Sequence, residues 1–169
     1  MKNISEALDK SQIWNLLKEI PDPEVPAINI VELGVVRDVI IHDDSLEIVI
    51  TPTYSGCPAM KVMEEDILST LKENGFENIK IKTIFSPPWT TDWMTDETKA
   101  KLKAYGIAPP DILSKEELFP FLAEKKKVLN CPYCNSENTV LQSQFGSTAC
   151  KALYYCNDCQ QPFEHFKCH

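Results

Sequence analysis

Residues 46–85, LEIVITPTYSGCPAMKVMEEDILSTLKENGFENIKIKTIF, decide the fold expected for this chain. The stretch opens with a short apolar run, Leu46 to Ile50, which is typical of a strand. NIKIKTIF, at its other end, predicts another strand. A helix is expected between them from Pro58, because apolar residues recur at helical spacing before a stop at Gly75; these residues are Met60, Met63, Ile67 and Leu71. This order predicts a right-handed βαβ crossover.

Two earlier segments complete the expected sheet and its helices. Residues 35–41 alternate with period two and are separated from residues 46–50 by HDDS, which predicts a β-hairpin. A helix from about Ser5 to Ile20 is predicted by four residues on one face, Ile13, Leu16, Leu17 and Ile20. A hairpin alone cannot bury enough surface to be stable. We therefore expect an α+β fold with a small mixed three-stranded sheet and helices on one face.

Prolines and glycines punctuate the chain after the third strand. PPW at 87–89 ends that strand, and a short helix is expected over 96–105 before Gly106. Ser114 and Glu117 fit a capping box for one more short helix.

We expect two domains with a boundary near residues 124–130. Residues 1–124 form the α+β domain, with a core at 5–90 and a helical extension after it. Residues 130–169 are set apart by their cysteines.

Composition and charge exclude several classes of function. No apolar run approaches the ~18 to 20 residues of a membrane span. The start of the chain lacks the basic-then-apolar pattern of a secretory signal, so we expect a cytoplasmic protein. The formal net charge is -8, and neither domain is basic. Nucleic-acid binding is therefore not expected, because it needs clustered cations.

Cys57 is the isolated cysteine of the first domain, and its position at a helix start gives it chemical interest. Pro58 suits the first helical position, which makes Cys57 the N-cap or nearly so. Free backbone N–H groups and the helix dipole would then favour its thiolate. The competing interpretation is a small buried residue that fills space between strand and helix. The sequence leaves both interpretations open.

Three motifs carry a resemblance to a known family. DPEVPAINIVELGVV, TPTYSGCP and PPW, in that order over about residues 10–90, resemble SufT-like iron–sulfur assembly factors. The resemblance implies a functional pocket for transient iron or an iron–sulfur cluster; its residues are Cys57, Asp22, Glu24, Thr51 and Thr53. A thiolate beside carboxylates holds iron without trapping it. The residues themselves leave another interpretation of DPE open, a turn that ends the first helix.

The second domain contains two Cys-x-x-Cys motifs, the first at Cys131 and Cys134 and the second at Cys156 and Cys159. In a reducing compartment such pairs indicate metal ligands rather than disulfides. This spacing predicts a small C-terminal ribbon around a structural zinc held by four thiolates. Iron is the chief competing metal, because four thiolates also suit it.

Three further residues raise the question of a second site in the ribbon. If strands enter and leave the second motif antiparallel, Cys150 and Cys168 lie together at the far end, roughly 20 Å from the zinc. With His169 they are a candidate labile metal site, which His165 could join. The alternatives are ordinary thiols or an adventitious disulfide.

A closer resemblance covers nearly the whole chain. FGSTACKALYYCNDCQQPFEHFKCH after such a first domain resembles the D-subunit family of bacterial phenylacetyl-CoA epoxidase systems. That resemblance implies, as partners, a di-iron oxygenase and an iron–sulfur flavin reductase, whose iron centres the chain would help to mature. Association with further copies of the chain is left open.

Three functions follow as hypotheses, all without catalysis by the chain itself. The first is an accessory factor that delivers or installs iron or a cluster, and the alternative is a structural or docking subunit of the oxygenase complex. A nucleic-acid-binding regulator is opposed by the charge. We do not expect an enzyme, because the chain offers no cofactor-binding glycine motif and no plausible nucleophile–base pair.

Overall fold

The structure, a computed structural model, describes residues 10–110 and 129–167. The chain divides into two compact units, Met1–Met94 and Thr95–His169. We describe each unit by itself.

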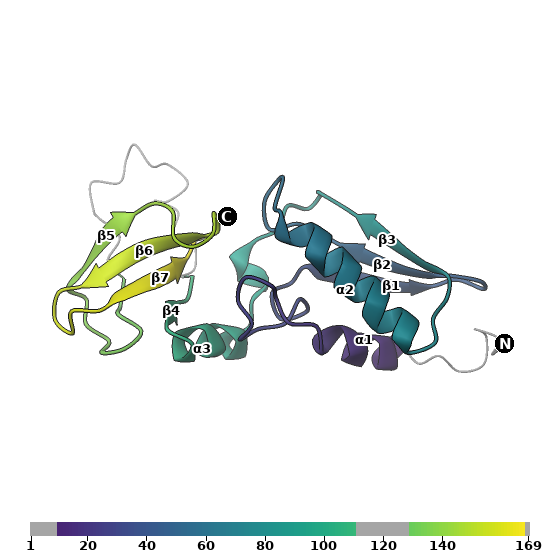
Figure 1. Ribbon diagram of the computed structural model, residues 1–169, viewed down its shortest axis with the longest axis horizontal. Helices are drawn as coiled ribbons and strands as arrows, with labels where there is room; N and C mark the ends of the chain where they lie inside the picture. The colour runs from purple at the N-terminus through teal and green to yellow at the C-terminus, as the bar shows by residue number, and fades with distance from the viewer. Residues whose placement is uncertain (1–9, 111–128, 168–169) are drawn as a thin grey trace. The chain divides into compact units, whose positions relative to one another are not determined.

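The first unit is built on the mixed sheet expected from the sequence (Figure 1). Strands β1 (Val36–Ile41) and β2 (Leu46–Ile50) form an antiparallel hairpin, and the backbone N–H of His42 donates to the carbonyl of Ser45 at its turn, at 2.8 Å. Strand β3 (Ile79–Thr83) lies parallel to β2, so β2 is central. The predicted hairpin and crossover are confirmed.

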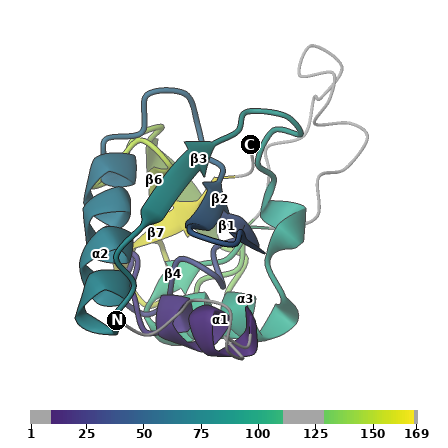
Figure 2. The same ribbon diagram turned by 90° about the vertical axis from the view of Figure 1, so that its right-hand side faces the viewer.

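Two helices cover this sheet. Helix α1 (Lys10–Lys18) contacts β1, and α2 (Ala59–Glu73) contacts β3 and α1 (Figures 1 and 2). The apolar face of α2 is the predicted one, with four long side chains buried: Met60, Met63, Ile67 and Leu71. Each such side chain contributes about 1.5 to 3 kcal/mol when it leaves water. The expected α+β class is confirmed.

The ends of the helices refine the sequence-based boundaries. Gly75 follows α2 with a φ of 90°, a left-handed conformation that suits glycine, as predicted. Pro58 is the N-cap of α2 rather than its first residue, so Cys57 lies one position before the cap. Helix α1 ends at Lys18, before Pro21, and the part of the predicted helix at residues 5–9 lies outside the described residues.

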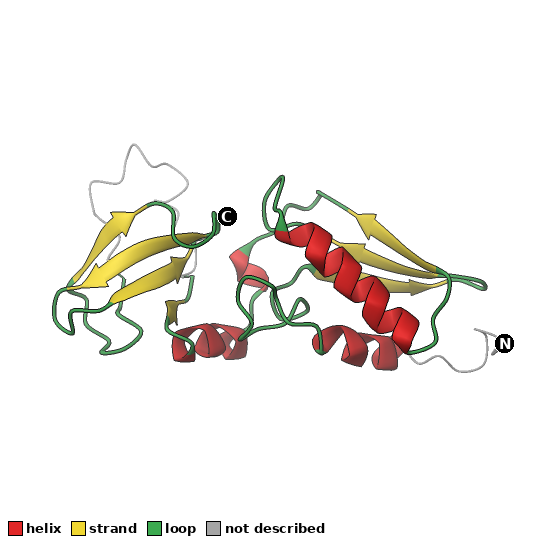
Figure 3. Ribbon diagram, viewed as in Figure 1, coloured by secondary structure: helices red, strands yellow, loops and turns green. Residues whose placement is uncertain are grey.

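The second unit contains a four-stranded sheet in the order β4-β7-β6-β5. Its strands are labelled in Figure 1 and drawn in yellow in Figure 3. Strands β5 (Thr139–Ser143), β6 (Lys151–Cys156) and β7 (Pro162–Phe166) are antiparallel and match the expected ribbon. Two elements precede them, α3 (Asp96–Ala104) and β4 (Ile107–Ala108), and β4 pairs with β7 in parallel.

The division of the chain differs from the boundary expected near residues 124–130. The helix α3 and the strand β4 belong to the unit that begins at Thr95, not to an extension of the first domain. The reason is tertiary pairing, because Ile107 and Ala108 add a strand to β7. The helix expected after Ser114 lies outside the described residues, as do Cys168 and His169.

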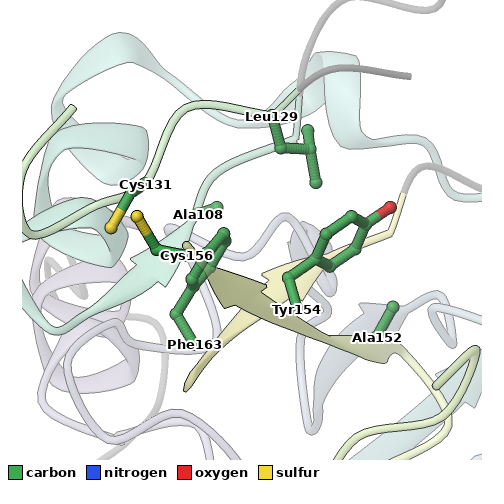
Figure 4. Packing of buried hydrophobic residues seen from close by; sticks show 7 residues of the cluster. All are labelled: Ala108, Leu129, Cys131, Ala152, Tyr154, Cys156 and Phe163. Atoms are coloured by element: carbon green, nitrogen blue, oxygen red, sulfur yellow. The ribbon is translucent and has the colours of Figure 1, made fainter. Parts of the chain in front are cut away.

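The core of the second unit is small and includes two of the cysteines. Figure 4 shows this cluster, with the sulfur atoms of Cys131 and Cys156 together at one end and Tyr154 further along β6. Its members come from β4, β6, β7 and the segment before β5: Ala108, Leu129, Cys131, Ala152, Tyr154, Cys156 and Phe163. In the described part of the chain, every helix is too short or too polar to cross a membrane.

Candidate functional site

The two Cys-x-x-Cys motifs fold into matching turns. The N–H of Cys131 donates to the carbonyl of Ser136 at 2.9 Å, and that of Cys156 donates to Gln161 at 3.0 Å. The residue after the second cysteine of each motif has a left-handed backbone, with φ of 61° at Asn135 and 59° at Gln160. Each turn therefore presents its two sulfurs on one side.

The four sulfurs converge on one point. All lie within 4.8 Å of one another, and the Sγ–Sγ distances are 3.6 Å for Cys131–Cys159 and for Cys134–Cys156. A tetrahedral ion with Zn–S bonds of ~2.3 Å separates its sulfurs by about 3.8 Å. The arrangement therefore fits one ion held by four thiolates.

The acidities of these thiols reflect their surroundings. The backbone N–H groups of Cys159 and Asp158 face Cys156 and lower its pKa to about 7. Burial and the neighbouring sulfurs raise the pKa of Cys159 to about 12. Backbone donors that stabilise a thiolate favour metal ligation at Cys156.

A side-chain clamp that the sequence analysis missed joins the two motifs. The carboxylate of Asp158, within the second motif, accepts hydrogen bonds from Ser136 Oγ at 2.5 Å and Asn138 Nδ2 at 2.8 Å. These two donors lower the pKa of Asp158. The sequence does contain a signal for these hydrogen bonds. An Asp lies between the cysteines of the second motif, small polar residues follow the first motif, and such residues commonly form hydrogen bonds in turns.

The far end of the ribbon carries a buried ion pair that was also missed. Lys151 Nζ lies 2.9 Å from Glu164 Oε2, and the Lys151 side chain is only 5% exposed. Glu164 Oε1 also accepts the N–H of Ser147 at 2.6 Å. Burial raises the pKa of Glu164, but the Ser147 and Lys151 contacts outweigh it and leave that pKa below its usual value.

Cys150 lies at this far end, as predicted from the number of residues along the antiparallel strands. The N–H of Lys167 donates to the Cys150 carbonyl at 2.9 Å, which places the start of β6 beside the end of β7. The Cys150 side chain is buried, and its sulfur lies 3.0 Å from Thr148 Oγ1. Its expected companions, Cys168 and His169, are outside the described residues, so the second site stays a prediction.

His165 occupies a structural position in the ribbon core. It is buried, its Nδ1 lies 3.1 Å from the Ala108 carbonyl, and its ring meets Tyr154 edge-on with centroids 5.8 Å apart. The imidazole thus joins β7 to β4.

Cys57 lies in the first unit where β2 passes into α2. Its N–H donates to the Tyr54 carbonyl at 3.3 Å, and its own carbonyl accepts the N–H of Met60, also at 3.3 Å. The residue is half-buried, while Ser55 and Gly56 in the same turn are exposed. The cysteine is therefore neither a filled core position nor a freely exposed thiol.

Asp22 holds a turn. It is buried, and its Oδ1 accepts the N–H groups of Glu24 at 2.9 Å and Val25 at 2.6 Å. The backbone N–H of Asp22 donates to Ile28 at 2.9 Å. The DPE motif is thus a hydrogen-bonded turn after α1, so any role of Asp22 toward iron would come in addition to this structural one.

Thr51 and Thr53 lie directly after β2, and both are buried. The Thr51 N–H donates to Val35 at 2.9 Å, but its Oγ1 has no hydrogen-bond partner within the described residues. A buried hydroxyl without a partner costs about 1 to 3 kcal/mol. This hydroxyl is the kind of group that a ligand or water satisfies.

Within residues 10–110 and 129–167, the four ribbon cysteines are the one group in which three or more candidate metal ligands lie this close together. Cys57, Asp22 and Glu24 do not form such a group. A transient site there would have to be completed by cargo or by another protein.

Comparisons with known proteins match each part of this arrangement. Residues 10–81 match the family model described as iron–sulfur cluster assembly protein, and residues 117–167 match the PaaD zinc β-ribbon domain. A crystal structure of a DUF59 domain from Bacillus anthracis shares 28% identity with a TM-score of 0.51, over 55% of this chain and 90% of that one.

Two curated relatives extend the match. The Fe-S protein maturation auxiliary factor YitW of Bacillus subtilis (strain 168) is 33% identical over 59% of this chain and 97% of its own length. An Escherichia coli (strain K12) protein, provisionally named as the D subunit of 1,2-phenylacetyl-CoA epoxidase, is 45% identical over 93% of this chain and 92% of its own length. With both units and their cysteine motifs accounted for, the chain belongs to the family of phenylacetyl-CoA epoxidase D subunits, which join an iron–sulfur assembly domain to a zinc ribbon.

Proposed function

We propose that this chain is a non-catalytic accessory factor of a phenylacetyl-CoA epoxidase system in the cytoplasm, where it matures the iron or iron–sulfur centres of partner subunits. The names of two relatives support the two parts of the proposal. The Escherichia coli relative is named as an epoxidase subunit, and the Bacillus subtilis relative is named as an Fe-S protein maturation factor. Its clients would be the oxygenase and the iron–sulfur flavin reductase.

The observation that carries the proposal is the position of Cys57. It is half-buried in an exposed turn, close in sequence to the buried hydroxyl of Thr51, which has no partner within the described residues. In our proposal Cys57 is the transfer thiolate, Asp22 and Glu24 are auxiliary ligands, and Thr51 and Thr53 line the site. A site with so few ligands suits iron that must leave again.

The proposed transfer is a ligand exchange without a change of oxidation state. As iron(II) or a preformed cluster binds, the Cys57 thiol gives its proton to solvent and forms an Fe–S bond. When ligands of the client replace it, that bond breaks and the thiol regains a proton.

The ribbon is proposed as a docking module stiffened by one structural zinc. Cys131, Cys134, Cys156 and Cys159 would hold the ion, which supplies the cross-link that so small a core needs. Metal analysis of protein purified without oxygen tests this assignment. We expect one zinc ion per chain. Iron in the protein, together with charge-transfer absorption bands, would instead identify the bound metal as iron.

Substitution of Cys57 tests the transfer role. We expect Cys57→Ser to fold normally but to leave the co-expressed oxygenase or reductase deficient in iron, measured as iron per client subunit. The residue lies outside the core, so folding should not change. Full iron loading of both clients by Cys57→Ser would end the transfer proposal.

A structural or docking role is the second candidate, favoured by the word subunit in the name of the relative. Reconstitution from clients that already contain metal separates the two roles. If turnover proceeds without this chain, maturation is its role; if turnover still needs it, the chain is a working part of the complex.

The candidate second site at Cys150, Cys168 and His169 has its own test. A double variant, Cys150→Ser with Cys168→Ser, should lower the metal content if these residues bind an ion. Unchanged metal content and unchanged client loading would leave them as ordinary thiols.

A further inference from the structure

We propose that the edge of the first unit beside Cys57 docks an apolar, uncharged surface of the client protein, with Phe85 as its anchor. We call this edge the docking rim and define it as residues 54–58 and 84–88. The inference rests on the proposed function and adds to it the surface by which the client is recognised.

The topology brings Phe85 and Cys57 to one edge of the sheet. Strands β2 and β3 are parallel and in register, with Ile50 beside Thr83, so both end at the same edge. Pairing continues one residue further, since the Ile84 N–H donates to the Ile50 carbonyl at 2.8 Å. Phe85 follows at once. Figure 1 shows the loop that leads from β2 to α2, and Cys57 lies within that loop by its position in the sequence.

The rim exposes an aromatic side chain. Phe85 is 65% exposed, whereas most apolar side chains of this unit are buried. Its neighbours on the rim are small or rigid and also exposed: Ser55, Gly56, Pro58, Ser86, Pro87 and Pro88. An aromatic ring with little conformational entropy to lose is typical of an interface anchor.

The rim also lacks charge in a chain that is otherwise highly charged. Residues 48–60 and 83–91 contain no Asp, Glu, Lys or Arg, although a quarter of the residues of the chain are charged. A surface that attracts nucleic acid or the phosphates of a coenzyme would need cations. Depletion of charge around an exposed aromatic is instead the pattern at the centre of protein–protein interfaces.

We therefore infer that the rim binds an apolar patch of the client. Cys57, whose iron or cluster passes to the client, lies on the same rim. Docking there would exclude water from Cys57 and bring the client's ligands to it. The three candidate ligands of this unit, Cys57, Asp22 and Glu24, are not gathered into one group, so a client that supplies ligands would complete the site.

A binding experiment with matched variants tests the rim. The affinity of the full chain for the purified oxygenase and reductase subunits is measured by calorimetry for wild type, Phe85→Ser, Phe85→Tyr and Ile41→Ser. Ile41 is the control, because it is an exposed apolar residue of the same sheet at the opposite edge, paired with Leu46. We expect Phe85→Ser to weaken binding about tenfold or more, with Phe85→Tyr and Ile41→Ser within about twofold of wild type.

A second set of measurements separates failure of the rim from failure of the function. Cys57→Ser should lose iron loading of the client through the missing thiolate, whereas Phe85→Ser should weaken client binding. If Phe85→Ser binds the client as wild type does while Cys57→Ser loses iron loading, the rim is overturned and the transfer proposal stands. If wild type neither binds nor loads any client, the proposed function fails and the rim with it. If Phe85→Ser alters only self-association in sedimentation, the rim contacts a second copy and our assignment of the occupant is wrong.

Discussion

At the scale of single residues, Asp22 combines two roles that a substitution can separate. One oxygen of its carboxylate accepts the N–H groups of Glu24 and Val25, which fixes the turn after α1. Its negative charge strengthens these hydrogen bonds and would also serve iron binding if the residue is a ligand. An asparagine keeps the accepting oxygen and loses the charge.

We expect Asp22→Asn to keep the free energy of unfolding within about 0.5 kcal/mol of wild type, whereas Asp22→Ala lowers it by about 1 to 2 kcal/mol because one buried and one partly buried N–H group lose their acceptor. Urea unfolding measures both. If Asp22 is an auxiliary ligand, Asp22→Asn also lowers iron loading of the client. Normal loading by a stable Asp22→Asn protein would assign the residue to the turn alone.

At the scale of elements, the ribbon strands are joined by the ion pair between Lys151 on β6 and Glu164 on β7. The ammonium group is almost fully buried, so it depends on its carboxylate partner. The folded pKa of Glu164 lies below its ordinary value of 4.5. Its stabilising contribution is therefore complete above about pH 4.5 and is lost as pH falls through the folded pKa.

We expect Glu164→Gln to lower the free energy of unfolding at pH 7 by about 2 kcal/mol, less than the ~3 to 5 kcal/mol of a fully buried pair because Glu164 keeps some exposure. The difference from wild type should shrink as pH falls from 4.5 through the lower folded pKa of Glu164, below which folded wild type is also neutral at this position. Thermal unfolding of both proteins with equal metal content measures this difference in stability.

The double variant Lys151→Met with Glu164→Leu is the control, and its free energy of unfolding should lie closer to that of wild type. If Glu164→Gln is less stable than wild type by the same amount at every pH, the stabilising role of the ion pair is contradicted.

At the scale of the whole molecule, the two units gain stability from different sources. The first unit has an extended apolar core between its helices and its sheet, whereas the second has a small cluster that includes two of the four grouped cysteines. A core of that size needs a cross-link, which an ion held by the four cysteines would supply.

Removal of the metal with a thiol-directed mercurial and a chelator should therefore unfold the second unit and leave the first intact. Two-dimensional NMR of labelled protein should show loss of dispersed signals from residues 129–167 and preservation of those from residues 10–94. Re-addition of zinc to the reduced protein should restore them. A ribbon that keeps its dispersed signals without metal would contradict this account of its stability.

Local patterns in the sequence predict the elements and the metal ligands well. The period of apolar residues identifies α2 and the hairpin β1–β2, because side-chain burial repeats with the geometry of each element. The spacing of the four cysteines predicts the cluster in which they meet, because a Cys-x-x-Cys turn directs both sulfurs to one side. The pocket around Cys57, predicted by resemblance, remains a proposal.

What the sequence by itself determined was therefore the mixed sheet of the first unit, the three antiparallel strands of the ribbon and the grouping of its four cysteines, all of which follow from short-range periodicity and spacing. Only the tertiary structure decided that β4 joins the ribbon through β7, that Lys151 meets Glu164, and that Phe85 shares an edge with Cys57. These pairings connect residues distant in the chain, and local propensity carries no information about which distant partner a segment finds.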